Sequence, residues 1–240
     1  MTASTIKALL FDLDGTLVDH DAAAEVALIQ ALQATPGLHH VDHALARRRW
    51  KQLAELAMDR YLAGEITFTG QRRLRVTSFA AELGLGTWAA PRADVWFADY
   101  LHHYESAWRI YPDVRTALDA LTEQHRHLRL GVLTNGDADQ QRKKLLHVGL
   151  AAELPEVIAS SEVGVAKPDA EIFHTGCARL RLAPQEVAYV GDRLHTDAIA
   201  ATDAGLRGIW LNRDDDSAPA GPPVIRTLDD LPVLLAGIAE

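Results

Sequence analysis

The sequence contains a single cysteine, and no apolar run in it approaches the roughly 20 residues that a helix needs to cross a membrane. The lone Cys177 excludes an internal disulfide, and residues 1–5 lack the long apolar stretch of a signal peptide. The formal net charge of −9 would repel a polyphosphate backbone. We therefore expect a cytoplasmic protein whose partners include neither a nucleic acid polymer nor a membrane.

What the sequence does have is the composition of an ordinary globular protein, with 48% hydrophobic and 24% charged residues. Its 240 residues suffice for one domain with a full core, or for a core domain with a smaller inserted one. We expect a monomer or a weak homodimer. Two interpretations stay open for the aromatic residues within 88–108, which form either a core between helices or a dimer patch. These residues are Trp88, Trp96, Phe97, Tyr100 and Trp108.

The most informative segment is residues 7–16, where an apolar run typical of a buried strand leads into two acids and a glycine. Asp12 and Asp14 stand one residue apart, and Gly15 releases them from strand pairing. In a parallel sheet this position is the carboxyl end of a strand, where ligands bind. Taken alone, the same residues also fit an ordinary Asp-Gly turn.

The periodicity of the chain changes twice. After the first strand, residues 19–108 show helical patterns only, over 21–33, 42–62, 71–83 and 91–108, with a short loop at 66–70. From residue 110 onward helices and strands alternate, which predicts right-handed crossovers and a parallel sheet. The strands are expected at 128–133, 157–159, 187–190 and 208–211, the helices at 114–124, 140–148, 170–180, 196–204 and 228–238, and a loop at 214–223.

Polar residues follow the later strands in the same position that Asp12 has after the first. Residues 130–133 lead into Thr134-Asn135-Gly136, whose hydroxyl, amide and backbone suit phosphate oxygens or a carboxylate. Residues 187–190 lead into Gly191-Asp192, with Asp197 five residues beyond, and Lys167-Pro168 lies between the two. Each feature alone fits a turn, a helix cap or a surface lysine, but their joint occurrence at strand ends indicates one site.

This order of motifs resembles the haloacid dehalogenase superfamily, a large group dominated by phosphatases. The family's four motifs correspond to residues 12–16, residues 134–136, residues 167–168, and residues 191–192 with Asp197. The resemblance implies an α/β fold with a Rossmann-like parallel sheet in three α/β/α layers, formed by residues 1–18 and 109–240. It also implies an inserted, all-helical cap domain over residues 19–108.

The resemblance implies that Asp12 is the nucleophile, which attacks phosphorus to form an aspartyl-phosphate that water hydrolyses. Asp14 would be the general acid for the leaving oxygen and then the base for the attacking water. Thr134, Asn135 and Lys167 would bind the substrate's phosphate oxygens, and Thr134 and Lys167 also count among the catalytic residues.

The resemblance also implies a divalent cation, and an all-oxygen site fits Mg²⁺. Its ligands would be Asp12, the backbone carbonyl of Asp14, and Asp192. Asp197 would complete the metal site or orient its ligands.

We therefore expect a Mg²⁺-dependent phosphatase that hydrolyses a small phosphorylated metabolite. A sugar phosphomutase of the same fold is an alternative. It would differ from a phosphatase by an extra phosphate site, contributed by cationic residues of the cap such as Arg72, Arg73 or Arg75. A non-catalytic, phosphate-binding regulatory protein is another alternative. A 2-haloacid dehalogenase is less favoured, because these enzymes generally lack the second acid of the first motif, and Asp14 is present.

Overall fold

The computed structural model describes residues 5–38, 40–214 and 221–238. The chain divides into two compact units. The sheet unit comprises Met1–Asp19 and Arg109–Glu240, and the helical unit comprises His20–Trp108. The sheet unit is therefore built from two segments of sequence that flank the helical unit.

A parallel sheet forms the centre of the sheet unit, with the strand order β3-β2-β1-β4-β5-β6. The first strand of the chain is central and pairs with β2 and β4. The expected α/β class with a Rossmann-like parallel sheet is confirmed. The strands are β1 (Ala8–Phe11), β2 (Arg129–Thr134), β3 (Glu156–Ala159), β4 (Val187–Gly191), β5 (Arg207–Leu211) and β6 (Val224–Ile225).

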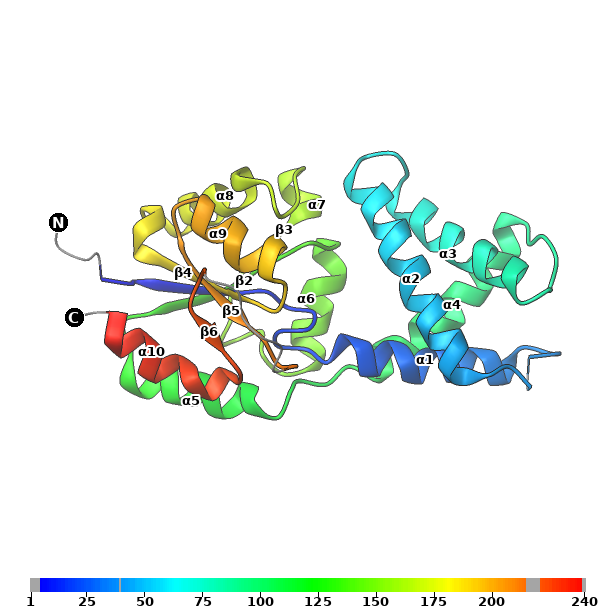
Figure 1. Cartoon of the computed structure of the whole chain (residues 1–240), viewed down its shortest axis with the longest axis horizontal. Helices are drawn as coiled ribbons and strands as arrows, with labels where there is room; N and C mark the ends of the chain where they lie inside the picture. Colours follow the sequence, from blue (N-terminus) through cyan, green and yellow to red (C-terminus); the bar gives the residue numbers. More distant parts are fainter. Residues whose placement is uncertain (1–4, 39, 215–220, 239–240) are drawn as a thin grey trace. The chain divides into compact units, whose positions relative to one another are not determined.

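Helices cover both faces of this sheet, because alternate strand residues point to opposite sides. In β1, Leu9 and Phe11 belong to one apolar cluster and Ala8 and Leu10 to another. The first cluster includes residues of α5 (Asp113–Gln124), α6 (Ala138–His147) and α10 (Leu231–Ile238), and the second includes residues of α8 (Ala170–Leu180) and α9 (Ala200–Asp203). Figure 1 shows α8 and α9 above the sheet and α5 and α10 below it.

The later elements differ in part from the sequence prediction. The helix expected over 196–204 is a π-helix, Leu194–Ile199, followed by α9. Its wider turn occurs where Asp197 directs a buried carboxylate inward. The helix expected from 228 begins as a 3-10 turn, Leu228–Asp230, and becomes α10. The pattern missed α7 (Ser160–Val163) and the two-residue β6, since both are too short to show a period. Of the expected loop 214–223, residues 215–220 lie outside the described residues.

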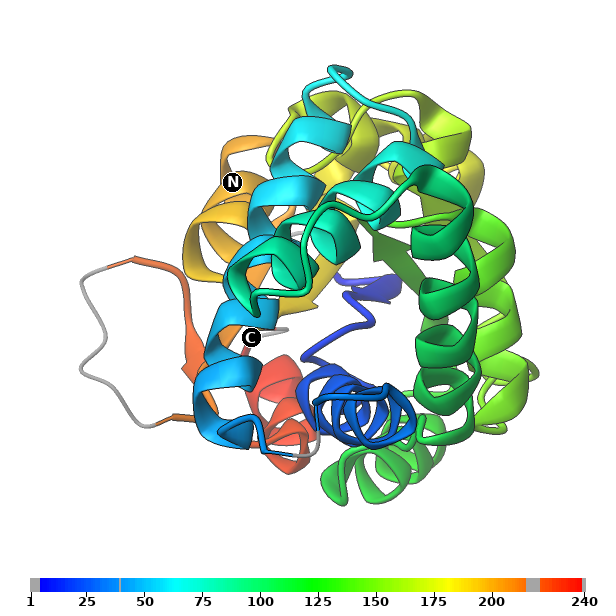
Figure 2. The same cartoon turned by 90° about the vertical axis from the view of Figure 1, so that its right-hand side faces the viewer.

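The helical unit contains α1 (His20–Ala34), α2 (His43–Leu62), α3 (Phe68–Glu82) and α4 (Ala90–Ser106). Figure 2 shows these helices, in which α1 packs against α4 and α2 against α3. Asp42 caps α2 by accepting hydrogen bonds from the backbone N–H groups of Ala44 and Leu45. The predicted start of α3 at residue 71 was wrong by three residues, because Thr67 caps it by accepting from Gly70.

The aromatic residues of the helical unit form its core. Trp88, Phe97, Tyr100 and Trp108 are all at most 7% exposed, which favours the core interpretation over a dimer patch for these residues. Trp50 lies against Tyr100 with the ring centroids 4.9 Å apart. Among the described residues, no helix has both the length and the apolar character needed to span a membrane.

Candidate active site

Parallel pairing brings the sequence-predicted groups to one edge of the sheet. Phe11 pairs with Val132 of β2 and with Val190 of β4, and the N–H of Asp12 donates to the carbonyl of Val190 at 2.8 Å. Asp12 therefore follows the central strand with the end of β2 on one side and the end of β4 on the other. Thr134 and the Gly191-Asp192 pair stand at those neighbouring strand ends, which is the ligand-binding edge of such sheets.

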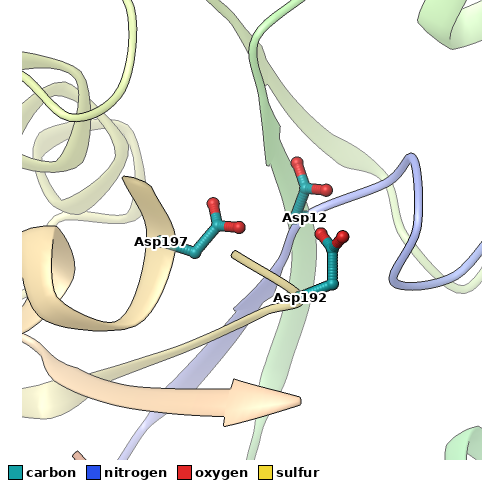
Figure 3. A group of neighbouring side chains, drawn as sticks. All are labelled: Asp12, Asp192 and Asp197. Atoms are coloured by element: carbon teal, nitrogen blue, oxygen red, sulfur yellow. The ribbon is translucent and has the colours of Figure 1, made fainter. Parts of the chain in front are cut away.

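Three carboxylates gather at this edge. One oxygen each of Asp12, Asp192 and Asp197 lies within 4.8 Å of the other two. Figure 3 shows Asp12 and Asp192 side by side at the strand ends, with Asp197 facing them from its helical turn. Asp12 is only 6% exposed and Asp197 only 1%. Such a cluster of oxygen donors has the chemistry that a hard divalent cation requires.

The ionisation of this cluster reflects its burial. Burial raises the pKa of Asp12 to about 7; the Lys167 ammonium opposes the shift and the Asp197 carboxylate adds to it. Burial, followed by repulsion from Asp197, also raises the pKa of Asp192 to about 6. Negative charge at this site is therefore incompletely balanced by the protein, and the site fits an added cation.

Lys167 supplies a positive charge beside Asp12 and Asp197. It is 4% exposed, so the alternative of a surface lysine is wrong. Its Nζ donates to Oδ1 of Asp12 at 2.6 Å, to Oδ1 of Asp197 at 2.7 Å and to the hydroxyl of Tyr189 at 2.7 Å. Burial disfavours the ammonium, but the carboxylates of Asp12 and Asp197 outweigh it and raise the pKa of Lys167.

Asn135 holds the backbone of Lys167 through two hydrogen bonds. Its Nδ2 donates to the carbonyl of Lys167 and its Oδ1 accepts from the N–H of Lys167, both at 2.8 Å. The side-chain amide of Asn135 thus joins the segment after β2 to the segment that carries the lysine. Thr134 is 2% exposed at the end of β2, and its hydroxyl accepts from Nε2 of Gln141 at 3.2 Å.

Asp197 is engaged by the protein on both oxygens. Oδ1 accepts from Lys167 and, at 3.0 Å, from the hydroxyl of Tyr189, while Oδ2 accepts from the N–H of Arg193 at 2.9 Å. A Cβ added to Gly191 would lie 2.4 Å from Cγ of Asp197, so only glycine permits this approach. These contacts favour an orienting role for Asp197 over direct ligation of a metal.

Asp14 lies in the turn that follows β1. Its backbone forms a bridge with Val18, and its carboxylate accepts from Nζ of Lys144 at 2.5 Å and from Nε2 of Gln141 at 3.1 Å. Sequence reasoning missed Gln141, Lys144 and Tyr189. The first two share the buried face of α6 with Ala138 and Leu145, and this helical spacing of polar and apolar residues was a usable signal. Tyr189 stood inside an apolar strand pattern and gave none.

Gly15 allows the turn to approach Asp192. Its φ is +91°, and an added Cβ would lie 2.5 Å from Oδ2 of Asp192. We expect Gly15→Ala to lower turnover by at least about 100-fold, because the turn or Asp192 must move. Gly149→Ala is the matched control: its φ of +73° brings similar strain, but nothing lies within 4 Å of the added Cβ. Initial rates of both variants test this, and equal rates would contradict it.

The candidate cap residues have partners within the helical unit. The exposed Arg73 donates to both carboxylate oxygens of Asp94 at 2.7 Å. The guanidinium of Arg72 lies 4.4 Å from the ring centroid of Phe68, and that of Arg75 lies 4.4 Å from the ring centroid of Trp50.

Comparison with known proteins identifies the family of this fold and site. Residues 6–205 match the model of the haloacid dehalogenase-like hydrolases. The chain therefore belongs to that family, and the expected family and hydrolase class are confirmed. It is 29% identical to a phosphoserine phosphatase of Thermus thermophilus, over 96% of this chain and 99% of that protein. It is 32% identical to a glyceraldehyde 3-phosphate phosphatase of Methanopyrus kandleri, over 89% and 91% of the two chains.

Solved structures show the same fold. The magnesium-bound HAD-hydrolase YfnB of Bacillus subtilis superposes with a TM-score of 0.81, with 24% identity, over 97% of this chain and all (100%) of that one. A 2-haloacid dehalogenase of Pseudomonas syringae superposes with a TM-score of 0.68 and 27% identity, over 97% and 99%. A HAD phosphatase of Thermococcus onnurineus superposes with a TM-score of 0.67 and 27% identity, over 97% and 99%. A phosphatase and a dehalogenase therefore share this architecture, and the site residues have to distinguish them.

Proposed function

We propose that the protein is a Mg²⁺-dependent phosphatase that hydrolyses the monoester of a small phosphorylated metabolite through an aspartyl-phosphate. The observation that carries this proposal is the pair of acids after β1. Asp12 is buried against Lys167 and beside Asp192, whereas Asp14 projects from the next turn and remains 28% exposed. The phosphatase activities of the two relatives, on phosphoserine and on glyceraldehyde 3-phosphate, support the same reaction class.

In this mechanism a carboxylate oxygen of Asp12 attacks phosphorus, and the bond between phosphorus and the ester oxygen breaks. Asp14 gives its proton to the departing oxygen. Water then attacks the phosphorus of the aspartyl-phosphate, Asp14 takes a proton from that water, and Asp12 is released with inorganic phosphate. Lys167 and the hydroxyl of Thr134 stabilise the charge on the phosphate oxygens in both steps.

The residues that would hold the cation are Asp12, Asp192 and the backbone carbonyl of Asp14. When bound, Mg²⁺ supplies positive charge that keeps Asp12 ionised and offsets repulsion between the carboxylates and an anionic substrate. Asp197, which is engaged by Lys167 on one oxygen and by Arg193 on the other, would hold the lysine in place beside Asp12.

The alternatives have less support. A halide departs without a proton, so a dehalogenase has no use for Asp14, whereas an alkoxide leaving group does need an acid there. A phosphomutase needs a second phosphate site, but Arg73 is paired with Asp94 and Arg72 lies on an aromatic face. A purely regulatory binder has no need for a nucleophile with a buried lysine beside it.

The affinity for Mg²⁺ is expected to weaken by roughly 10- to 100-fold when the pH falls from about 8 to about 5.5. Asp12, with a pKa of about 7, and Asp192, with a pKa of about 6, are then protonated and must each lose a proton before they can bind a cation. Calorimetric titration of the protein with Mg²⁺ at several pH values measures this. Asp192→Asn should flatten the dependence, and a constant native affinity across this range would contradict the assignment.

The proposal is tested by phosphate release from phosphoserine, glyceraldehyde 3-phosphate, sugar phosphates, nucleotides and p-nitrophenyl phosphate, with Mg²⁺ and with a chelator. Mg²⁺-dependent release from at least one ester is the expected result. Chloride release from a 2-chloro acid, measured in parallel, reports on the dehalogenase alternative. Release of chloride with no release of phosphate would overturn the proposal.

A further inference from the structure

Two side chains of α6 hold the carboxylate of Asp14 by both of its oxygens. Nζ of Lys144 donates to Oδ1 at 2.5 Å, and Nε2 of Gln141 donates to Oδ2 at 3.1 Å. Two donors from one helix restrict both the rotation and the tilt of the carboxylate. A carboxylate that must meet first a leaving oxygen and then a water molecule gains most from this restriction.

The burial of Lys144 is unusual for a lysine. Its side chain is 2% exposed, whereas its neighbour Lys143 is exposed. A buried ammonium is costly unless it is paired and hydrogen-bonded, so the contact with Asp14 matters to the lysine as well as to the acid. An ordinary amphipathic helix would have an apolar residue at this inward position.

Gln141 connects Asp14 to the substrate-binding edge. Its Nε2 also donates to the hydroxyl of Thr134 at 3.2 Å, and its Oε1 is buried with no partner among the described residues. The amide therefore turns its donor toward two acceptors and leaves its own acceptor unsatisfied. A Cβ added to Gly136 would lie 2.6 Å from this Nε2, so the glycine of the Thr-Asn-Gly segment leaves the space that Gln141 occupies.

We propose that Lys144 and Gln141 are positioning residues that fix the carboxylate of Asp14 for proton transfer to and from the reacting oxygens. This inference rests on the proposed phosphatase function. It adds a role for α6, whose side chains hold Asp14 of the first motif in place. Neither residue needs to contact the substrate, because Lys144 acts through Asp14, and Gln141 acts through Asp14 and Thr134.

The dependence on the leaving group separates positioning from a merely structural role. p-Nitrophenolate departs from phosphorus without a proton, whereas an alkoxide needs the acid. The ratio kcat/KM reports only the steps up to departure of the leaving group. For Lys144→Met we expect kcat/KM to fall at least about 30-fold on an alkyl phosphate such as glycerol phosphate, and at most about threefold on p-nitrophenyl phosphate. Lys143→Met, one residue away, is the control and should leave both values unchanged.

Two further variants extend the test, and the first of them also replaces Lys144→Met if that variant does not fold. Gln141→Leu removes the second donor to Asp14 and also the donor to Thr134, so it should lower kcat/KM on both esters, with the larger loss on the alkyl ester. In an Asp14→Asn background, the substitution Lys144→Met should change kcat/KM on the alkyl ester by less than about twofold, since the group that it positions is already gone.

Each outcome has a defined meaning. A selective loss on the alkyl ester supports the inference, whereas equal losses on both esters, or a gain, would overturn it while the phosphatase proposal stands. If the native chain hydrolyses neither ester nor any other phosphate monoester, the proposed function fails and this inference fails with it.

Discussion

Asp12→Asn is expected to lower phosphate release by about 10⁴-fold or more, because the amide cannot form the bond to phosphorus. The fold should persist. The substituted amide retains an oxygen that can accept from Lys167, and the native carboxyl, with its pKa of about 7, is only partly ionised at neutral pH without a cation. Initial rates on the best substrate, together with thermal unfolding, measure both expectations.

Two controls make this result specific. Asp12→Ala excludes residual activity that arises from slow deamidation of the asparagine. Asp139→Asn, at an exposed position on α6, removes a carboxylate from the same unit without touching the site, and it should retain native activity. Retention of more than about a hundredth of native turnover in Asp12→Ala would contradict the role of Asp12 as nucleophile.

Lys167→Met is expected to lower both activity and stability. Activity should fall by roughly 10²- to 10³-fold, since the phosphate oxygens lose a buried positive charge. The free energy of unfolding should fall by about 3 to 5 kcal/mol near neutral pH, because Asp12 and Asp197 are left buried without their shared partner. Chemical denaturation of the metal-free protein measures the second effect.

The pH dependence of this loss identifies its cause. The ammonium opposes the rise in the pKa of Asp12, so without it the folded pKa of this carboxyl lies further above its unfolded value. Such groups destabilise the fold increasingly as pH rises from the unfolded toward the folded pKa, so the variant should be least impaired at acidic pH and most impaired at alkaline pH. Lys143→Met should show no such trend. A loss of stability that is independent of pH would point to a packing defect instead.

The sequence was sufficient to predict the fold and the strand-end acids for one physical reason. In a parallel sheet every strand ends at the same edge, so apolar runs followed by polar residues predict a shared site before any contact is known. Asp12 and Asp192 follow neighbouring strands and do meet. The depth at which Lys167 is buried was not readable, because a lysine after a loop has the same pattern whether it points outward or inward.

The supporting residues needed the tertiary structure. Tyr189 lies on β4, which pairs with β1, the strand that leads to Asp12. Its hydroxyl accepts from Lys167 and donates to Asp197 of the π-helix. Gln141 and Lys144 matter because α6 presents its inward face to the turn that carries Asp14. A local pattern shows that such side chains are inward, but it does not show what they meet.

The most direct test of the account is to trap the covalent intermediate. The enzyme is mixed with excess substrate and Mg²⁺, quenched in acid within the first turnovers, and treated with borohydride, which reduces an acyl phosphate to an alcohol. Peptide mass spectrometry then locates the reduced residue. We predict homoserine at position 12, only when substrate is present and never in Asp12→Asn. Steady turnover with Asp12 unmodified, or with the modification at another carboxylate, would contradict the assignment of Asp12 as the nucleophile.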